Sequence, residues 1–146
     1  MIPLLQQPVF ALYAICSAIL IITFYALAFL TAKTRADRKA VINYEDVKIN
    51  SGASVVEVEH LDVQRIKRAH MNALENAVPF FIIGFIYSQS APSMMMAQGL
   101  FFSFVTIRVL HAVFYLSAKQ PFRTMSFAIG ALLNLTMVVQ VLRAVL

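Results

Sequence analysis

The residues from Val9 to Ala32 contain no charged side chain and are mostly aliphatic or aromatic. A helix rises about 1.5 Å per residue, so a run of this length crosses a hydrocarbon core of about 30 Å with some tilt. In a soluble protein, a helix that is apolar on all sides would need a large core around it. The run therefore predicts that the first long helix of this chain spans a membrane.

The composition of the whole chain agrees with a lipid environment. Hydrophobic residues make up 60% of the 146 residues, charged residues only 13%, and the mean hydropathy is +0.76. A soluble domain carries about 45–50% apolar and about 25% charged residues. The net charge of +5 does not indicate a nucleic-acid partner, because the basic residues stand beside apolar spans, where membrane lipid head groups are the nearer anions.

Four helices are expected to cross the membrane, at about residues 9–32, 61–90, 94–116 and 124–145. The second begins with a charged half and becomes apolar only from Ala77 to Tyr87. Pro92 separates it from the third helix, because proline cannot continue the hydrogen-bond ladder of a helix. The sequence thus predicts an all-α integral membrane protein, a four-helix bundle in a single domain of residues 1–146 with one polar loop at about 33–60.

Basic residues gather at one end of this predicted bundle. They lie in the 33–60 loop, at the start of the second helix and before the fourth: Lys33, Arg35, Arg38, Lys39, Lys48, Arg65, Lys67, Arg68, Lys119 and Arg123. The opposite end carries only Arg143. Cytoplasmic loops are enriched in Lys and Arg, so we expect the loop in the cytoplasm and both termini on the non-cytoplasmic side.

Polar side chains form stripes on two of the predicted helices. On the second, Arg65, Arg68, Asn72 and Glu75 fall within an arc of about 80° at about 100° per residue. On the third, Arg108, His111 and Tyr115 fall within an arc of about 60°. Charged side chains inside a bilayer cost about 2.5–3.5 kcal/mol each and usually face a bundle interior or a wet cavity.

Two structural explanations compete with a ligand site. Arg and Lys near helix ends often extend to the lipid head groups, and a Glu75–Arg108 ion pair could join two helices. The set of arginines, an amide and a carboxylate favours a ligand with several anionic groups and one cationic group, such as a small zwitterionic peptide. No metal site is expected, because three scattered histidines and the single Cys16 give no ligand spacing.

Several segments resemble the family of membrane-associated proteins in eicosanoid and glutathione metabolism (MAPEG). They are Arg65–Phe80 on the second helix, Arg108–Tyr115 on the third, Gln120–Phe127 at the entry of the fourth, and Arg35, Arg38-Lys39 and Asn43–Asp46 in the loop. The resemblance implies a homotrimer of four-helix protomers, with glutathione bound between neighbouring protomers on the cytoplasmic side.

The resemblance also implies a role for individual residues. Glutathione would be bound by Arg35, Arg68, Asn72, Glu75, His111 and Tyr115, with Arg65, Arg108 and Asp46 as further candidates. Arg123 would face the glutathione sulfur, and Thr124 stands where a relative has serine. Met71 and Phe127 replace an arginine of the prostaglandin E synthases and a tyrosine of the prostaglandin and leukotriene branches, so this chain is more similar to the microsomal glutathione transferases.

The predicted function is therefore that of a glutathione transferase acting within the membrane, with glutathione as co-substrate and a lipophilic electrophile as partner. It would conjugate the glutathione thiolate to activated carbon atoms and could also reduce lipid hydroperoxides. One alternative is a glutathione-dependent enzyme like prostaglandin E synthase or leukotriene C synthase. Others are a non-catalytic lipid-binding scaffold of the same fold and, for an unrelated four-helix bundle, a small transporter.

Overall fold

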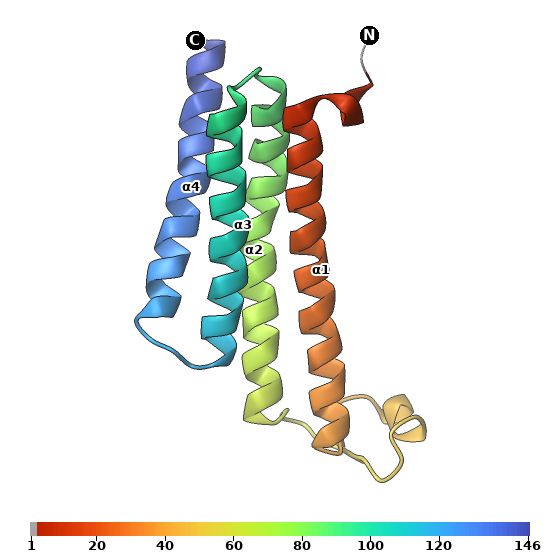
Figure 1. Ribbon diagram of the computed structural model, residues 1–146. Coiled ribbons are helices and arrows are strands. Elements are labelled where there is room, and N and C mark those ends of the chain that lie inside the picture. The colour runs from red at the N-terminus through yellow and green to blue at the C-terminus, as the bar shows by residue number, and fades with distance from the viewer. Residues whose placement is uncertain (1–2) are drawn as a thin grey trace.

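The computed structural model describes residues 3–146 as an elongated helical bundle. Within these residues the long helices are α1 (Pro8–Asp37), α2 (Leu61–Gln89), α3 (Met94–Leu116) and α4 (Phe122–Val145). Figure 1 shows them side by side, with the start of α1 and the end of α4 at one end of the bundle and the α1–α2 loop at the other. A short 3-10 helix, η1 (Leu4–Gln6), precedes α1.

Three of these helices have the length and composition of membrane spans. Of the helices in the described chain, α1, α3 and α4 are long and apolar enough to cross a membrane. The outer face of α1 agrees with this, since Ile22 is 67% exposed and Tyr25 and Phe29 are 73% exposed. Large apolar side chains on an outer face are stable in lipid but unfavourable in water. The fourth predicted span, α2, is not among them, and its half near the loop carries Asp62, Arg65, Lys67, Arg68 and Glu75.

The helix ends are set by local signals. Pro8 lies in the first turn of α1, where its missing N–H leaves no hydrogen bond unmade. The Oγ of Ser93 accepts a hydrogen bond from the Met96 amide at 3.3 Å and caps α3. The His60 Nδ1 accepts from the Asp62 amide at 3.2 Å at the start of α2.

Two predicted boundaries were wrong. The first helix was expected to end at about residue 32, but α1 continues to Asp37. The extra turn is polar, and Lys33 pairs with Asp37 at 3.1 Å one turn later, so it is stable outside the apolar span. The fourth helix was expected from about 124, but α4 begins two residues earlier, at Phe122, directly after Pro121.

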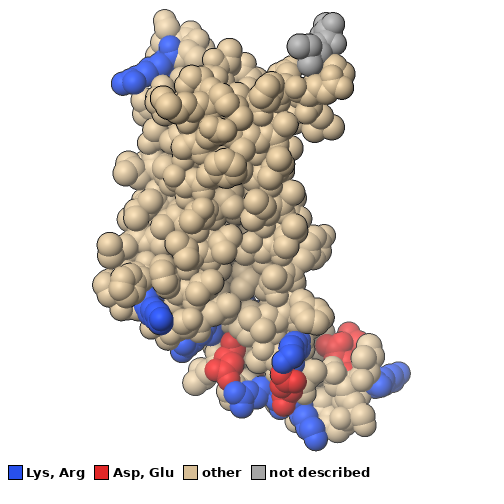
Figure 2. Space-filling view, viewed as in Figure 1, with Lys and Arg blue, Asp and Glu red and all other residues tan. Residues whose placement is uncertain are grey.

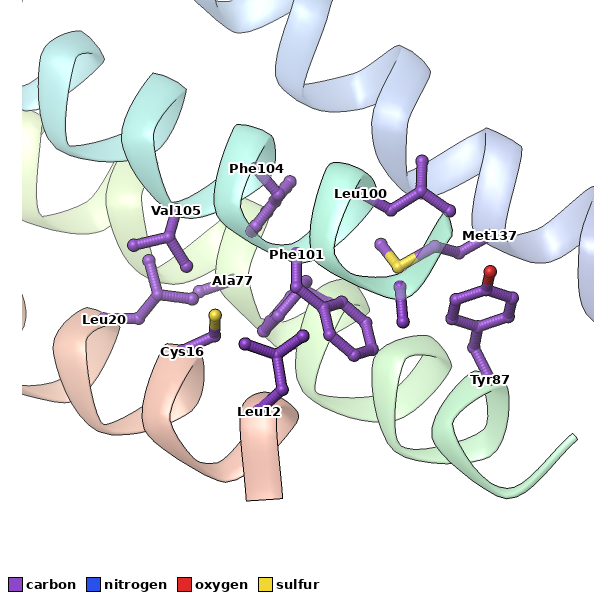
Figure 3. Close-up of a cluster of buried hydrophobic side chains, with 12 residues drawn as sticks. Leu12, Cys16, Leu20, Ala77, Tyr87, Leu100, Phe101, Phe104, Val105 and Met137 are labelled. Carbon is purple, nitrogen blue, oxygen red and sulfur yellow. The ribbon is translucent and has the colours of Figure 1, made fainter. Parts of the chain in front are cut away.

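The core lies between α1, α2 and α3, with Met137 contributed by α4 (Figure 3). Phe80 of α2 stacks on Phe104 of α3 with ring centroids 4.5 Å apart, and Phe101 meets Phe80 edge-on at 5.7 Å. α2 and α3 each contact every other long helix, whereas α1 and α4 do not contact each other within the described chain. The half-charged α2 is therefore held inside the bundle by its apolar face.

The α1–α2 loop is more ordered than a simple polar loop. Its strands β1 (Ala40–Val41) and β2 (Ser54–Val55) pair in parallel and enclose a 3-10 helix, η2 (Tyr44–Lys48). Glu59 then joins the loop to two helices, because it accepts hydrogen bonds from Arg35 of α1 and from Lys67 of α2. The sequence pattern did not predict these strands, since each has only two residues.

Charge is distributed unevenly along the bundle. Figure 2 shows that most of the Lys, Arg, Asp and Glu side chains on the visible face gather toward the loop end. All seven acidic residues fall between Asp37 and Glu75 in the sequence. The end of the bundle where α1 starts and α4 ends therefore has almost no charge, apart from Arg143.

Candidate functional site

Five of the predicted site residues come together at the loop end of the bundle. A pocket of about 230 Å³ is lined by Asn72 of α2, His111 and Tyr115 of α3, and Arg123, Thr124 and Phe127 of α4. α2 and α3 contribute from the polar stripes expected from the sequence, and the first turns of α4 complete the surface. We call this the polar pocket.

Arg123 lies at the start of α4, and its guanidinium packs against an aromatic ring. Its Cζ lies 4.7 Å from the centroid of the Tyr115 ring, within the range of a cation–π contact. Arg123 also lies in the first turn of α4, where the helix dipole favours a negatively charged group. The neighbouring Thr124 Oγ1 donates to the Gln120 Oε1 at 3.0 Å. The guanidinium and the helix end together make this wall of the pocket attractive to an anion.

His111 is held in one orientation by a residue that the sequence did not single out. The Ser126 hydroxyl donates to the Arg123 carbonyl at 3.0 Å, so its oxygen accepts from the His111 Nδ1, also at 3.0 Å. The proton of the neutral imidazole is therefore on Nδ1 and the lone pair on Nε2. The Nε2 is buried and has no partner within residues 3–146, so it can accept a hydrogen bond from a bound molecule.

Behind the polar pocket, Arg108 is almost completely enclosed, with 2% of its surface exposed. Its Nη2 donates to the Asn72 Oδ1 at 2.9 Å and to the Asn72 carbonyl at 3.2 Å, while Nε and Nη1 have no partner in the described chain. Gly130 of α4 makes room for it, since a Cβ there would lie 3.3 Å from the Arg108 Cδ. Arg108 thus supports Asn72 rather than lining the pocket.

Glu75 lies in an adjoining groove. That groove, of about 450 Å³, is lined by Glu75, Asn76, Pro79, Phe127, Ala131, Asn134 and Leu135. Phe127 lines both the groove and the polar pocket, so the two hollows share a wall. No ion pair joins Glu75 to Arg108 among the described residues, and the structural bridge considered from the sequence is therefore not formed in this chain.

The remaining predicted residues lie outside the polar pocket of this chain. Arg35 pairs with Glu59, as described above. Arg68 is exposed and donates to the Gln64 Oε1 at 3.3 Å. Arg65 lines a separate hollow between α1 and α2, and Asp46 accepts a hydrogen bond from Asn43 at 3.3 Å in the loop. A single copy of the chain therefore brings together only part of the predicted glutathione site.

No group of three His, Cys, Asp or Glu side chains in the described chain could hold a metal ion. The expectation of a site without metal stays a prediction. The sequence analysis did not single out Ser126, which contacts His111, or Glu59, which pairs with Arg35. The signal for Ser126 was its helical spacing from Arg123, and for Glu59 it was an acid just before a helix rich in basic residues.

Comparison with known proteins identifies the family of this chain. Human microsomal glutathione S-transferase 1 is 34% identical over 144 residues, which cover 96% of this chain and 93% of the relative. Human prostaglandin E synthase is 32% identical over 139 residues, covering 94% and 91%, and mouse prostaglandin E synthase is 34% identical over 131 residues, covering 89% and 85%. The sequence model of the MAPEG family matches residues 13–143. Because the match extends from α1 to α4, the resemblance seen in the sequence is confirmed, and this chain belongs to the MAPEG family.

Proposed function

We propose that the protein is a glutathione transferase of the membrane, which joins the sulfur of glutathione to lipophilic electrophiles. The observation that carries this proposal is the meeting of Arg123, Tyr115 and His111 with Asn72 around one polar pocket. Human microsomal glutathione S-transferase 1 is among the relatives, with similarity along nearly the whole chain. A pocket with a cation at its edge and no acidic lining residue suits a thiolate.

The chemistry needs no nucleophile from the protein, because glutathione carries its own thiol. The thiolate is the attacking species, and positive charge lowers the pKa of a thiol from about 8.5. A thiol pKa lower by about two corresponds to about 2.7 kcal/mol. A charge-assisted hydrogen bond from Arg123, worth about 1.5–3 kcal/mol, and the dipole of α4, worth about 0.3–1 kcal/mol, supply that amount together.

The reaction has two balanced steps. The thiol first loses its proton to water, with Arg123 beside the resulting thiolate. The thiolate then attacks the electrophilic carbon, forming a carbon–sulfur bond as the leaving group departs with its electron pair. Thr124 is the second candidate for a hydrogen bond to the sulfur, and its hydroxyl would have to turn away from Gln120 to donate it.

The charged ends of glutathione require residues outside the polar pocket of one chain. We propose that a homotrimer completes the site, with Arg35, Arg68 and Asp46 facing the ligand from a neighbouring protomer and Glu75 receiving the ammonium group. The supporting observation is that Arg68 and Glu75 are exposed on α2 and form no ion pair within residues 3–146. Exposed charges beside apolar spans are costly unless a ligand, another protomer or water satisfies them.

We propose that α2 also crosses the membrane, so that the bundle has four spans. In support, α2 runs along the full bundle between α1, α3 and α4, and its charged residues from Asp62 to Glu75 occupy only the half near the loop. The excess of Lys and Arg at the loop end favours a cytoplasmic loop and non-cytoplasmic termini. The polar pocket would then open toward the cytoplasm, where glutathione is dissolved.

The electrophile would reach the sulfur from the lipid. The groove that holds Glu75 continues along α2 and α4 over apolar residues such as Pro79, Ala131 and Leu135. Because Phe127 separates this groove from the polar pocket, an apolar molecule in the groove would lie beside a thiolate held by Arg123. Lipophilic molecules concentrate in the bilayer, so a lateral entry is the shortest path.

A second candidate function is a glutathione-dependent isomerase of an oxidised lipid, favoured by the similarity to prostaglandin E synthases. Phe127 offers no hydroxyl at the wall between the two hollows, and this favours the transferase. Conjugation of a chloronitroaromatic compound and isomerisation of prostaglandin H separate the two activities.

The proposal is tested by titrating the purified protein in detergent with glutathione near neutral pH and following the ultraviolet absorption of the thiolate. We expect a saturable thiolate signal in wild type, and no such signal with S-methylglutathione, which has no ionisable thiol. Binding without turnover of any electrophile would instead favour a lipid-binding scaffold. Absence of glutathione binding would overturn the proposal.

A further inference from the structure

A second polar hollow lies at the opposite end of the bundle, where α2 ends, α3 begins and α4 ends. It has a volume of about 330 Å³, and its polar lining comes from Tyr87, Ser90, Ser93, Gln140 and Arg143. We call it the far-end pocket. It shares no lining residue with the polar pocket or with the groove of Glu75, so the proposed glutathione chemistry does not explain it.

Tyr87 is the deepest polar residue of the far-end pocket. Only 2% of its surface is exposed, and its ring lies edge-on to Phe101 with centroids 5.8 Å apart. Figure 3 shows the ring extending from α2 toward α4, with the hydroxyl at its tip. The hydroxyl forms no hydrogen bond within residues 3–146, and the small exposed part of the side chain opens to the pocket that it lines. A buried phenol normally finds a partner, so this one is left available to a ligand.

Three further polar groups of the far-end pocket have hydrogens to donate, whereas the Ser90 hydroxyl already donates to the Tyr87 carbonyl at 2.9 Å. The Ser93 Oγ accepts from the Met96 amide at 3.3 Å, which leaves its hydroxyl hydrogen unused. The Gln140 amide and the Arg143 guanidinium make no side-chain hydrogen bond or ion pair in the described part of the chain. Ser93 is also the N-cap of α3, whose dipole places partial positive charge beside the Ser93 hydroxyl, while the carboxyl ends of α2 and α4 at this end carry partial negative charge.

The side chains of the far-end pocket carry charge of one sign. Arg143 is its only charged residue, and all acidic residues of the chain lie between Asp37 and Glu75, away from this end. A set of hydroxyl, amide and guanidinium donors around one positive charge is suited to an oxyanion with several acceptor oxygens. The pocket also lies where the apolar helices α3 and α4 reach their ends, which is the level of lipid head groups.

We propose that the far-end pocket binds a phosphate group, held by Arg143, the Tyr87 hydroxyl, Gln140 and Ser93. Two sources offer this chemistry: the head group of a membrane phospholipid and free inorganic phosphate. The apolar rim formed by Pro92 and Met96 suits the glycerol and first acyl carbons of a lipid. Binding would tie the α2–α3 turn to the end of α4, independently of glutathione.

The test measures binding to the full-length protein in a phosphate-free detergent by native mass spectrometry. The probes are dihexanoyl phosphatidylglycerol, inorganic phosphate and dihexanoylglycerol, which lacks the phosphate. The variants are Arg143→Gln, which removes an exposed charge, and Tyr87→Phe, which removes one oxygen and keeps the ring. The matched controls are Lys119→Gln at the other end of the bundle and Tyr25→Phe on the outer face of α1.

We expect one phosphatidylglycerol per chain in wild type and in both controls, binding weaker by about tenfold or more in each variant, and no binding of dihexanoylglycerol. Displacement of the lipid by millimolar inorganic phosphate would assign the site to phosphate alone, and failure to displace it would assign the site to a lipid head group. Equal lipid binding by wild type and Arg143→Gln would overturn the proposal, as would equal binding of the phosphate-free probe. Glutathione conjugation should be unchanged in Arg143→Gln, so failure here is distinguishable from failure of the proposed transferase activity.

Discussion

The guanidinium of Arg108 on α3 donates to both the side-chain and the backbone oxygen of Asn72 on α2, at 2.9 Å and 3.2 Å. One buried cation thereby joins two helices just behind the polar pocket and fixes an amide in its wall. Gly130 of α4 packs against the same arginine, so three helices depend on this contact. The stability of the bundle and the shape of the pocket are therefore linked at one pair of residues.

Replacement of Asn72 by leucine should destabilise the bundle, because it leaves part of a buried guanidinium without a partner. We expect a loss of about 1.5–3 kcal/mol in the free energy of unfolding, the usual value of a hydrogen bond to a charged group. The same Asn72→Leu substitution should cost less when it is made in an Arg108→Leu variant. The effects of substitutions at two residues in direct contact do not add. Denaturation in mixed micelles measures the free energy of unfolding of the single and double variants. Gln98→Leu, which replaces an exposed amide of α3, is the control. Additive losses would show that the pair is not coupled.

Replacement of Arg123 by alanine should raise the pKa of the bound glutathione thiol. We expect the pH–rate profile of conjugation to move to higher pH and the rate at neutral pH to fall by more than about tenfold, because less thiolate is present. Glutathione binding should weaken less than the rate. Arg123→Lys should restore part of the activity, and Lys119→Ala serves as the charge-matched control. An unchanged pH–rate profile in Arg123→Ala would remove Arg123 from this role.

Replacement of Ser126 by alanine should act through His111. The imidazole loses the acceptor for its Nδ1–H, so the ring and its Nε2 are no longer held toward a ligand. We expect the KM for glutathione to rise by about three- to tenfold, equivalent to about 0.7–1.4 kcal/mol, with a smaller change in kcat. Ser103→Ala, on an exposed serine of α3, is the control. Equal KM values in both variants would show that Ser126 does not position His111.

Replacement of Glu59 by glutamine should reveal a pH-dependent contribution to stability. Burial raises the pKa of the Glu59 carboxyl, but hydrogen bonds and charge from Lys67 and Arg35 outweigh it, so the pKa lies below its ordinary value of 4.5. A lowered folded-state pKa stabilises the protein fully above the ordinary value, and this contribution is lost as the pH falls through the folded-state value.

We expect the contacts of Glu59 to add about 1 kcal/mol to the free energy of unfolding at pH 7. This is near the upper end of the range for surface ion pairs, because the Glu59 side chain is only 10% exposed. Melting temperatures of wild type and Glu59→Gln should differ at pH 7 and approach each other as the pH falls below 4.5. Glu57→Gln, at an exposed neighbour in the same loop, should show no difference at either pH. A gap between wild type and Glu59→Gln that stays constant down to pH 3 would contradict this assignment.

The polar pocket could be predicted in part because helical spacing is regular. Asn72 on α2 and His111 and Tyr115 on α3 fall on polar stripes that a period of 3.6 residues makes visible in the sequence. The role of Arg108 could not be predicted in this way. Its stripe position suggested a ligand contact or a bridge to Glu75, and only the packing of α2 against α3 and α4 shows that it supports Asn72.

The sequence by itself determined the helices, their approximate limits and the end of the bundle that carries charge, because hydropathy and periodicity are local properties of the chain. Only the tertiary structure decided which polar side chains meet. Arg123 lies over Tyr115, Ser126 forms a hydrogen bond with His111, and Glu59 forms an ion pair with Arg35. These pairings depend on the rotation and depth of one helix against another. Those quantities are set by the fit of residues such as Phe80, Phe104 and Gly130 against neighbouring helices, and no spacing rule along a single helix contains that fit.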